Sequence, residues 1–350
     1  MPYYDGTKLL SMKDATGNTP EIYLCTTNRT GGKTTYFNRL LFNKWVKSGS
    51  KFGLIYRYNY ELDDVAEKYF KDIKGLFFPE WNVESKKRAR GVYHEILAYN
   101  VKNPDIKNVC GYALSLNSAD TIKKMSHLFN DIDRMFFDEF QSETNHYCDD
   151  EIKKFISVHT SIARGNGKAV RYVPVYMCGN TVSIINPYYV ELGISERLRE
   201  DTKFLKGNGF VLEQGYVDSV AEMQKQSAFN MAFSASKYVA YSNQCVYLND
   251  STSFIEKPIG KSRYIATIRY NDKDFAIREF AEDGLIYCDD KADYTYPYRI
   301  SVTTKDHNIN YVMLNKYDMF IQNMRWYFEK GSFRFKDLRS KEAILKLISY

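Results

Sequence analysis

The chain has 350 residues, of which 44% are hydrophobic, so it can bury a sizeable core and wholesale disorder is excluded. Its net charge of +6 permits a polyanionic partner without requiring one. The six cysteines are scattered and form no C-x-x-C pair, which excludes a disulfide framework and a zinc site and predicts a reducing compartment.

The first half of the chain alternates expected strands and helices. A short apolar run at residues 21–25 leads into a glycine-containing loop, and residues 34–46 then place apolar side chains at helical spacing. Further strands are expected at residues 52–56, 92–101, 109–116, 134–139 and 173–178, and further helices at residues 62–73 and 149–163. This alternation predicts an α/β fold with a mostly parallel sheet.

The pattern changes near residue 200. Residues 197–240 are mixed, and strands then dominate at 245–248, 263–270, 274–280 and 285–288, before helices at 316–329 and 340–349. We therefore expect three domains, at residues 1–197, 198–240 (a small linker domain) and 241–350. The sequence shows no signal peptide and no apolar run of membrane-spanning length, so we expect a cytosolic protein without a membrane partner.

Residues 27–34, with the sequence TNRTGGKT, fit the phosphate-loop template G-x-x-x-x-G-K-[ST] except at its first glycine. The preceding strand and the following helix are the context that this motif needs. The Lys33 ammonium would reach the β- and γ-phosphates, the Thr34 hydroxyl would bind Mg²⁺, and backbone amides would cradle the phosphates. The residues expected to bind ATP are Thr27, Arg29, Thr30, Gly31, Gly32, Lys33 and Thr34.

Asp138 and Glu139 follow the hydrophobic run 135–137, downstream of the phosphate loop. Asp138 would hold Mg²⁺, and Glu139 would polarise the attacking water as a general base. A solvated strand end is the alternative interpretation, and the upstream phosphate loop makes it the weaker one. Together the two motifs predict an ATP hydrolase.

Phosphoryl transfer needs positive charge near the γ-phosphate. Arg164 is the leading candidate, because it ends the helix after Asp138 and could be presented to a neighbouring subunit; alternatively, it complements the dipole of that helix. Arg57 and Lys124 are weaker candidates. Asn180, at the end of the next strand, could sense the γ-phosphate or simply cap a turn.

Several segments also carry a resemblance to a known family. They are NRTGGKT at 28–34, IYRYNYEL at 55–62, MFFDEF at 135–140, CGNTVSIINPYY at 178–189, FIEKP at 254–258, RYIATIRYN at 263–271, DGLIYCDD at 283–290 and GSFRF at 331–335. They span nearly the whole chain, which resembles the DNA encapsidation ATPases of small phi29-like tailed phages, in the large-terminase branch of ring ATPases.

The resemblance implies a P-loop ATPase domain of the ASCE class, a linker domain, and a C-terminal α+β domain with an RNase H-like, vestigial nuclease fold. It also implies a homo-oligomeric ring, usually a pentamer, that docks on the portal (connector) of a prohead in the host cytoplasm and drives double-stranded DNA inward. A packaging RNA is a further candidate partner. By position, Arg164 matches the trans-acting arginine finger, and Arg57 and Lys124 fall near positions proposed to act between subunits.

A metal-dependent nuclease of this fold needs acidic side chains that converge on two metal ions. The strand at 263–270 carries no carboxylate, and Thr267 and Arg269 stand where one would be wanted. We therefore expect the C-terminal domain to lack nuclease activity and to bind DNA, the portal or RNA. Two alternatives stay open: a full terminase with an active nuclease, and a nucleotide-regulated adaptor without sustained hydrolysis.

Overall fold

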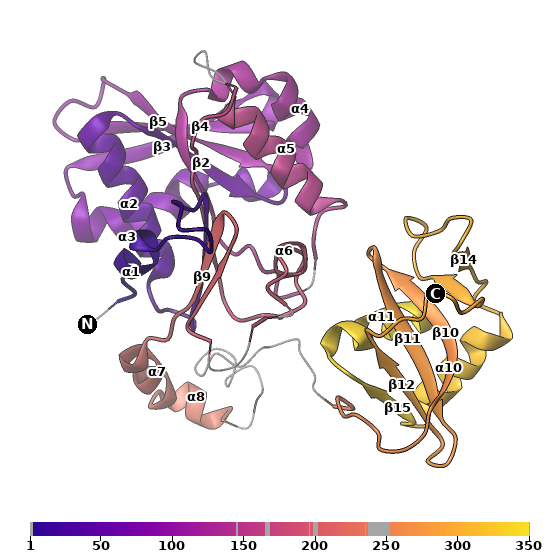
Figure 1. The fold of residues 1–350 in the computed structure, drawn as a ribbon. Helices are drawn as coiled ribbons and strands as arrows, with labels where there is room; N and C mark the ends of the chain where they lie inside the picture. The colour runs from indigo at the N-terminus through magenta and orange to yellow at the C-terminus, as the bar shows by residue number, and fades with distance from the viewer. Residues whose placement is uncertain are drawn as a thin grey trace. The chain divides into compact units, whose positions relative to one another are not determined.

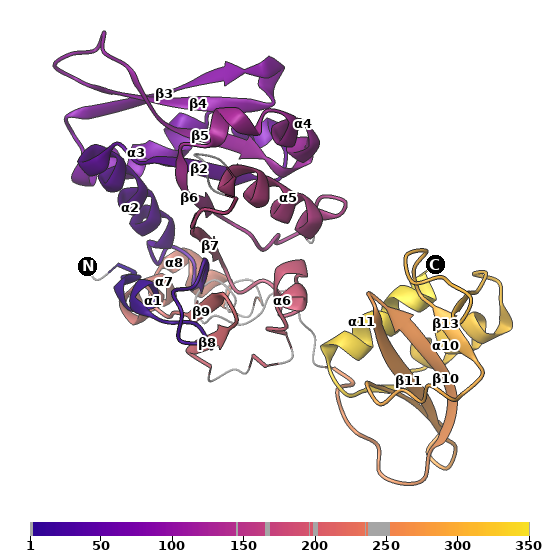
Figure 2. The same ribbon diagram turned by 45° about the horizontal axis from the view of Figure 1, so that its top comes forward.

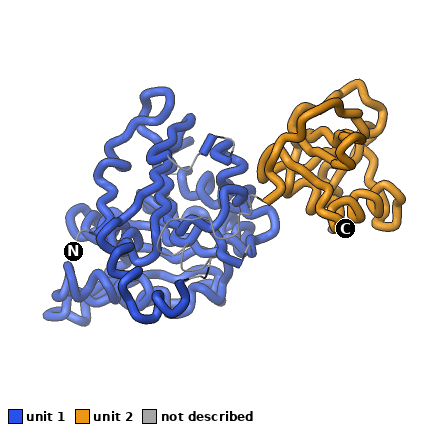
Figure 3. Tube along the Cα trace, turned by 90° about the horizontal axis from the view of Figure 1, so that it is seen from below, with its two compact units in different colours: residues 1–249 blue, residues 250–350 orange. Residues whose placement is uncertain are grey.

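The computed structural model describes residues 3–144, 146–164, 169–195, 197–198, 202–234, 236 and 253–349. It divides the chain into two compact units, residues 1–249 and residues 250–350, which Figure 3 draws in different colours. Each unit has its own hydrophobic core. The strand expected at residues 245–248 lies outside the described residues. Within the described residues, no helix has the length and hydropathy needed to cross a membrane.

The first unit is built on one mixed sheet (Figure 1). Its nine described strands lie in the order β3-β4-β5-β2-β6-β7-β1-β9-β8. Neighbours from β5 to β9 in this order pair in parallel, and the pairs at the two edges are antiparallel. The expected mostly parallel α/β sheet is therefore confirmed. The strands are β1 (Ile22–Thr26), β2 (Lys51–Tyr56), β3 (Trp81–Arg88), β4 (Tyr93–Asn100), β5 (Asn108–Ser115), β6 (Ile132–Phe137), β7 (Val175–Gly179), β8 (Phe204–Gly207) and β9 (Phe210–Gln214).

Helices cover both faces of this sheet (Figure 2): α2 (Lys33–Ser48) and α3 (Val65–Phe77) pack on one face, and α4 (Ala119–Lys124) and α5 (Glu151–Ala163) on the other. Successive side chains of a strand point to opposite faces. Tyr23 and Cys25 of β1 accordingly join the core under α2, and Leu24 joins the core under α5. A strand that is apolar on both faces is typical of the centre of a parallel sheet.

Short helices and 3-10 turns connect these elements. They are α1 (Thr7–Ser11), α6 (Pro187–Glu191), α7 (Asp218–Lys225), α8 (Ala228–Ala232), η1 (Asn59–Leu62), η2 (Ala89–Gly91), η3 (Leu116–Ser118) and η4 (Ser126–Phe129).

The start of the expected linker domain belongs to the sheet of the first unit. Residues 204–214 form the β8–β9 hairpin, and β9 pairs in parallel with β1 through the buried residues Phe210, Val211 and Leu212. Burial of these side chains beside β1 fixes the hairpin there, so the sheet continues past the boundary expected at residue 197. Of the described part of the expected linker, α7 and α8 stand outside the sheet.

The second unit is an α+β structure with a sheet in the order β14-β13-β10-β11-β12-β15. Strands β10, β11 and β12 form an antiparallel meander, and β13 and β14 continue in parallel from β10, as expected for an RNase H-like fold. Helices α10 and α11 supply apolar residues to its core. The elements are β10 (Arg263–Tyr270), β11 (Lys273–Phe280), β12 (Leu285–Asp289), β13 (Arg299–Ser301), β14 (Val312–Met313), α10 (Met319–Glu329), β15 (Phe333–Phe335) and α11 (Leu338–Ser349).

Candidate active site

The loop between β1 and α2 has the conformation that a phosphate loop requires. Gly32 is the N-cap of α2 and has a φ of 87°, a left-handed conformation that glycine adopts at the lowest cost. Lys33 and Thr34 begin the helix directly after it. The backbone amides at this helix N-terminus are therefore available to bind phosphate.

Thr27, which stands in place of the first glycine of the template, packs inside the loop. It is fully buried, and its hydroxyl donates to the Asn28 carbonyl at 2.8 Å. A Cβ added to Gly31 would lie 3.1 Å from the Thr27 Oγ1, so the threonine packs tightly against that glycine. The Asn28 side chain pairs with the Val217 backbone, accepting from its N–H at 3.0 Å and donating to its carbonyl at 3.4 Å. The threonine thus leaves the loop shape intact.

Two side-chain contacts join the loop to the ends of neighbouring strands. Lys33 Nζ donates to Asn180 Oδ1 at 2.7 Å, and the Thr34 hydroxyl donates to Asp138 Oδ2 at 2.9 Å. Asp138 follows β6 and Asn180 follows β7. The carboxyl ends of parallel strands meet at one edge of a sheet, which is why residues far apart in sequence converge at this loop.

The electrostatics of Asp138 fit a magnesium ligand. Burial raises the pKa of the Asp138 carboxyl to about 6; the Lys33 charge opposes this shift, and the Glu139 charge adds to it. A divalent cation would reverse the balance and favour the carboxylate. A hydroxyl and a carboxylate in contact beside a phosphate loop are the ligands expected of a magnesium site completed by water and phosphate.

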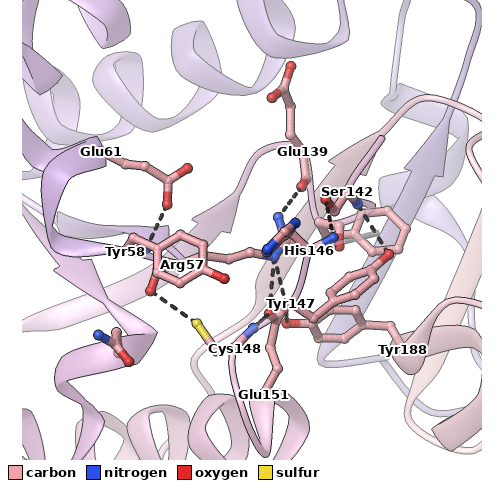
Figure 4. Close-up of polar contacts among 12 residues, drawn as sticks. Arg57, Tyr58, Glu61, Glu139, Ser142, His146, Tyr147, Cys148, Glu151 and Tyr188 are labelled. Atoms are coloured by element: carbon pink, nitrogen blue, oxygen red, sulfur yellow. Dashed lines mark hydrogen bonds and ion pairs between the residues drawn. The ribbon is translucent and has the colours of Figure 1, made fainter. Parts of the chain in front are cut away.

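Glu139 sits in a strained turn. Its φ of 53° lies in the left-handed region, which is unusual for a residue other than glycine. Its side chain is exposed. Figure 4 shows the carboxylate pointing away from Arg57, whereas the Glu139 main-chain carbonyl accepts from Arg57 Nη1 at 2.8 Å. The Glu139 side chain is therefore exposed, while Arg57 holds the backbone of the turn through the Glu139 carbonyl.

Arg57 is the centre of a buried polar cluster (Figure 4). Its guanidinium donates to the carbonyls of Glu139 and Phe140, and its Nε lies 3.0 Å from a carboxylate oxygen of Glu151. The side chains of Arg57 and Glu151 are 8% and 2% exposed. Burial by itself lowers the pKa of Arg57, but the charge and hydrogen bond of Glu151, together with Tyr188 and Tyr147, raise the pKa above its ordinary value. The guanidinium is thus engaged inside its own subunit, in place of the expected position between subunits.

The Glu151 carboxylate also accepts hydrogen bonds from two other residues. It accepts from the Tyr188 hydroxyl at 2.7 Å and from the Cys148 N–H at 2.8 Å. Neither Glu151 nor Tyr188 was among the expected site residues, and little in the sequence points to them. A glutamate in the first turn of a helix is an ordinary cap, and a tyrosine in an apolar run is an ordinary core residue.

The remaining expected residues lie apart from these contacts. Arg29 forms an ion pair of 2.6 Å with Glu143, a partner that the sequence did not indicate. Arg164 follows α5, is exposed, and donates from Nε to the Thr160 carbonyl at 3.4 Å. Lys124 is exposed at the end of α4. The structure thus brings the two halves of the expected ATP site together and leaves Arg164 and Lys124 on the surface.

The chain is similar to known proteins over most of its length. The family profile of the podovirus DNA encapsidation protein (Gp16) matches residues 2–349. The DNA packaging protein of Bacillus phage phi29 is 22% identical over 308 residues, which are 87% of this chain and 86% of that protein. The DNA packaging protein of Bacillus phage B103 is 22% identical over 310 residues, which are 87% of this chain and 89% of that protein.

The chain also shares its fold with solved structures. A chain of the bacteriophage Phi-29 viral genome packaging motor assembly aligns with a TM-score of 0.69 at 21% identity, covering 99% of this chain and 100% of that one. A chain of the Phi-28 gp11 DNA packaging motor aligns with a TM-score of 0.59 at 14% identity, covering 99% and 97%.

Proposed function

Because this chain belongs to the podovirus DNA encapsidation protein family, we propose that it hydrolyses ATP to drive double-stranded viral DNA into a preformed prohead. The observation that carries the proposal is the junction of the two motifs at one sheet edge, Lys33 with Asn180 and Thr34 with Asp138. A phosphate loop joined in this way to an acidic strand end is the arrangement of P-loop ATPases.

The residues at this edge divide the work of phosphoryl transfer. The amides of residues 31–34 and the Lys33 ammonium bind the phosphates, and Thr34 and Asp138 would hold Mg²⁺, which would supply charge neutralisation. On ATP binding, Lys33 exchanges its Asn180 contact for a phosphate oxygen. Glu139 orients the attacking water and accepts its proton. Since transfer of a phosphoryl group depends on position, the strained turn that carries Glu139 has to be held firmly.

The site is completed by a neighbouring subunit. We propose that Arg164 acts in trans on the γ-phosphate of the next subunit, because it is exposed at the end of a helix. Lys124, which is also exposed, is a second candidate for a contact between subunits. The assembly would be a homo-oligomeric ring, a pentamer by resemblance, docked on the portal in the host cytoplasm, with a packaging RNA as a further candidate partner.

The second unit is proposed to bind DNA, the portal or RNA without cutting DNA. Among the described residues, no group of three or more His, Cys, Asp or Glu side chains is placed to hold a metal ion. Arg269, in the strand that would supply the first acid, instead pairs with Asp274 at 2.8 Å. Incubation of the full chain with plasmid and Mn²⁺ tests this proposal, and cleavage would favour the full-terminase alternative.

The test of the main proposal is the ATPase rate with and without double-stranded DNA, with the oligomeric state measured on the same sample. We expect DNA to stimulate turnover. Lys33→Ala should abolish ATP binding, whereas Glu139→Gln should bind ATP and not turn it over. A normal rate for Glu139→Gln would contradict its role as the base, and a single turnover followed by arrest in the wild type would favour the adaptor alternative.

A further inference from the structure

A cavity of about 180 Å³ lies between the ends of β2 and β6 and the helices α2 and α3. Its lining includes Thr34, Asp138 and Glu139, which the proposed function assigns to Mg²⁺ and to the attacking water. It also includes Asn38, one turn after Thr34 on α2, to which no role has been assigned. A water molecule takes up roughly 30 Å³ in the liquid, so the cavity has room for several.

Asn38 carries a buried acceptor that the protein does not satisfy. The residue is 5% exposed, and its Oδ1 atom accepts no hydrogen bond from any residue that the structure describes. A buried polar atom without a partner destabilises a fold, and native proteins satisfy nearly all such atoms with protein groups or ordered water. The Oδ1 atom of Asn38 therefore requires a donor that the protein itself does not supply.

Tyr69 of α3 fixes the orientation of the Asn38 side chain. Asn38 Nδ2 donates to the Tyr69 carbonyl at 3.0 Å, and the Tyr69 hydroxyl donates to the Asn38 carbonyl at 3.2 Å. A main-chain carbonyl can only accept, so the NH₂ group of the amide has to face Tyr69. The atom left without a protein partner is therefore the amide oxygen, which is an acceptor.

The position of Asn38 relates this acceptor to the expected magnesium ligands. Residues four apart lie on the same face of a helix, which places Asn38 beside Thr34. Both line the cavity together with Asp138, whose carboxylate accepts from the Thr34 hydroxyl at 2.9 Å. Mg²⁺ gives up its waters reluctantly and usually keeps several of them when it binds to a protein. Such waters are hydrogen-bond donors, which is what Asn38 Oδ1 lacks.

We propose that Asn38 positions Mg²⁺ in the ATP site, with its Oδ1 atom accepting a hydrogen bond from a water of the magnesium coordination shell. Asn38 is a positioning residue, because it acts through this water. The inference rests on the proposed function, since it takes Thr34 and Asp138 as the magnesium site. It extends that function by giving a role to a buried amide that lies between Phe37 and Leu41 in the apolar face of α2.

The experiment measures how strongly Mg²⁺ supports nucleotide binding. Isothermal titration calorimetry on the full chain gives the Kd of AMP-PNP, an ATP analogue that is not hydrolysed, once with Mg²⁺ and once with EDTA. The ratio of the Kd in EDTA to the Kd in Mg²⁺ is the magnesium coupling. Asn38→Leu removes the acceptor and should lower this coupling about tenfold, as expected when a group that orients a metal's ligands is lost. The Kd in EDTA should stay unchanged, because the phosphate contacts remain.

Asn38→Asp separates this role from a purely structural one. The aspartate keeps an acceptor and adds a negative charge that attracts a divalent cation, but it loses the donor to the Tyr69 carbonyl. Its magnesium coupling should therefore equal or exceed that of the wild type. A structural role for Asn38 predicts a loss of coupling in both variants, since both lose the bond to Tyr69. Asn43→Leu, a change on the same helix that lies outside the cavity lining, is the matched control and should keep the coupling.

The outcomes separate this inference from the proposed function. A wild-type coupling in Asn38→Leu would overturn the inference, and so would equal losses in Asn38→Leu and Asn38→Asp. If Asn38→Leu does not fold, which circular dichroism will show, Asn38→Asp decides alone: a lower coupling overturns the inference, and an equal or higher one supports it. A wild type that fails to bind AMP-PNP, or binds it equally well in Mg²⁺ and in EDTA, contradicts the proposed function itself.

Discussion

Arg57 Nη1 donates a 2.8 Å hydrogen bond to the main-chain carbonyl of Glu139, and the Arg57 Nε lies between both carboxylate oxygens of Glu151 at 3.0 and 3.1 Å. One guanidinium thus links a buried acid to the left-handed turn that carries the proposed catalytic base. A planar fork of donors can make these contacts together, whereas an ammonium group cannot. We therefore assign Arg57 a positioning role.

Replacement of Arg57 by lysine should lower kcat at least tenfold and change KM for ATP by less than about twofold, because the turn loses its support while the phosphate contacts remain. Steady-state ATPase kinetics measure both parameters. Arg88→Lys is a matched control, since Arg88 forms an ion pair with Glu95 on the distant pair β3–β4. Equal losses in the two variants would argue against a specific role for Arg57.

Replacement of Asn180 by aspartate should weaken ATP binding. The Asn180 Oδ1 atom holds Lys33 Nζ at 2.7 Å, and a carboxylate there would hold the ammonium more strongly and repel phosphate. We expect the Kd for ATP to rise roughly tenfold or more, an effect of about 1.4 kcal/mol. Binding of a fluorescent ATP analogue would measure it. Asn100→Asp, a similar change at the end of β4, should leave the Kd unchanged.

Replacement of Asp138 by asparagine should stabilise the protein in the absence of nucleotide and Mg²⁺. The native pKa of Asp138 is raised to about 6 from 3.8, so between these values the native state binds more protons than the unfolded state. Stability therefore falls as pH rises through this window and stays reduced above it. An asparagine side chain does not ionise, so the variant avoids this loss of stability. We expect the Tm at pH 7.5 to rise by about 2–4 °C, for a gain in unfolding free energy on the order of 1 kcal/mol.

Thermal unfolding followed by circular dichroism, at pH 7.5 and again near pH 4, measures this change. Near pH 4 the gain should shrink, because Asp138 is then protonated in the native wild type. Asp72→Asn, a change of an exposed carboxylate on α3, should not alter Tm. A lower Tm of Asp138→Asn at pH 7.5 would mean that the ionised carboxylate stabilises the fold.

The Arg164→Ala variant should lose activity by about 10³-fold or more alone, as expected for an arginine finger. Mixed with Lys33→Ala subunits, it should regain part of the activity, because each inactive subunit keeps the half of the site that the other lacks. Activity as a function of mixing ratio is the measurement. If no ratio restores turnover, Arg164 does not act in trans.

The sequence alone was enough to predict the family, which is confirmed, and it also predicted the local parts of the proposed ATP site. The loop at residues 27–34 is contiguous, and its chemistry follows from the order of its residues. Asp138 and Glu139 follow a strand that is apolar enough to be placed from its pattern. The alternation of short strands and helices likewise predicted the parallel sheet, since local propensity and burial agree in such a sheet.

The sequence could not give the partners that these residues find across the fold. Asn180 meets Lys33, Glu151 meets Arg57, and Glu143 meets Arg29, each over about a hundred positions or more of the chain. Such pairs depend on strand order, and strand order is decided by which apolar faces pack together.

The same reason explains the β8–β9 hairpin, whose mixed composition predicted a linker and whose burial beside β1 made it part of the sheet. The sequence by itself was enough to predict which groups bind phosphate and magnesium in the proposed site, because that chemistry belongs to residue types and their spacing. Only the tertiary structure decided that Arg57 faces inward and supports Glu139. A buried guanidinium needs an opposite charge and hydrogen-bond acceptors, and the fold supplies the Glu151 carboxylate and the Glu139 carbonyl.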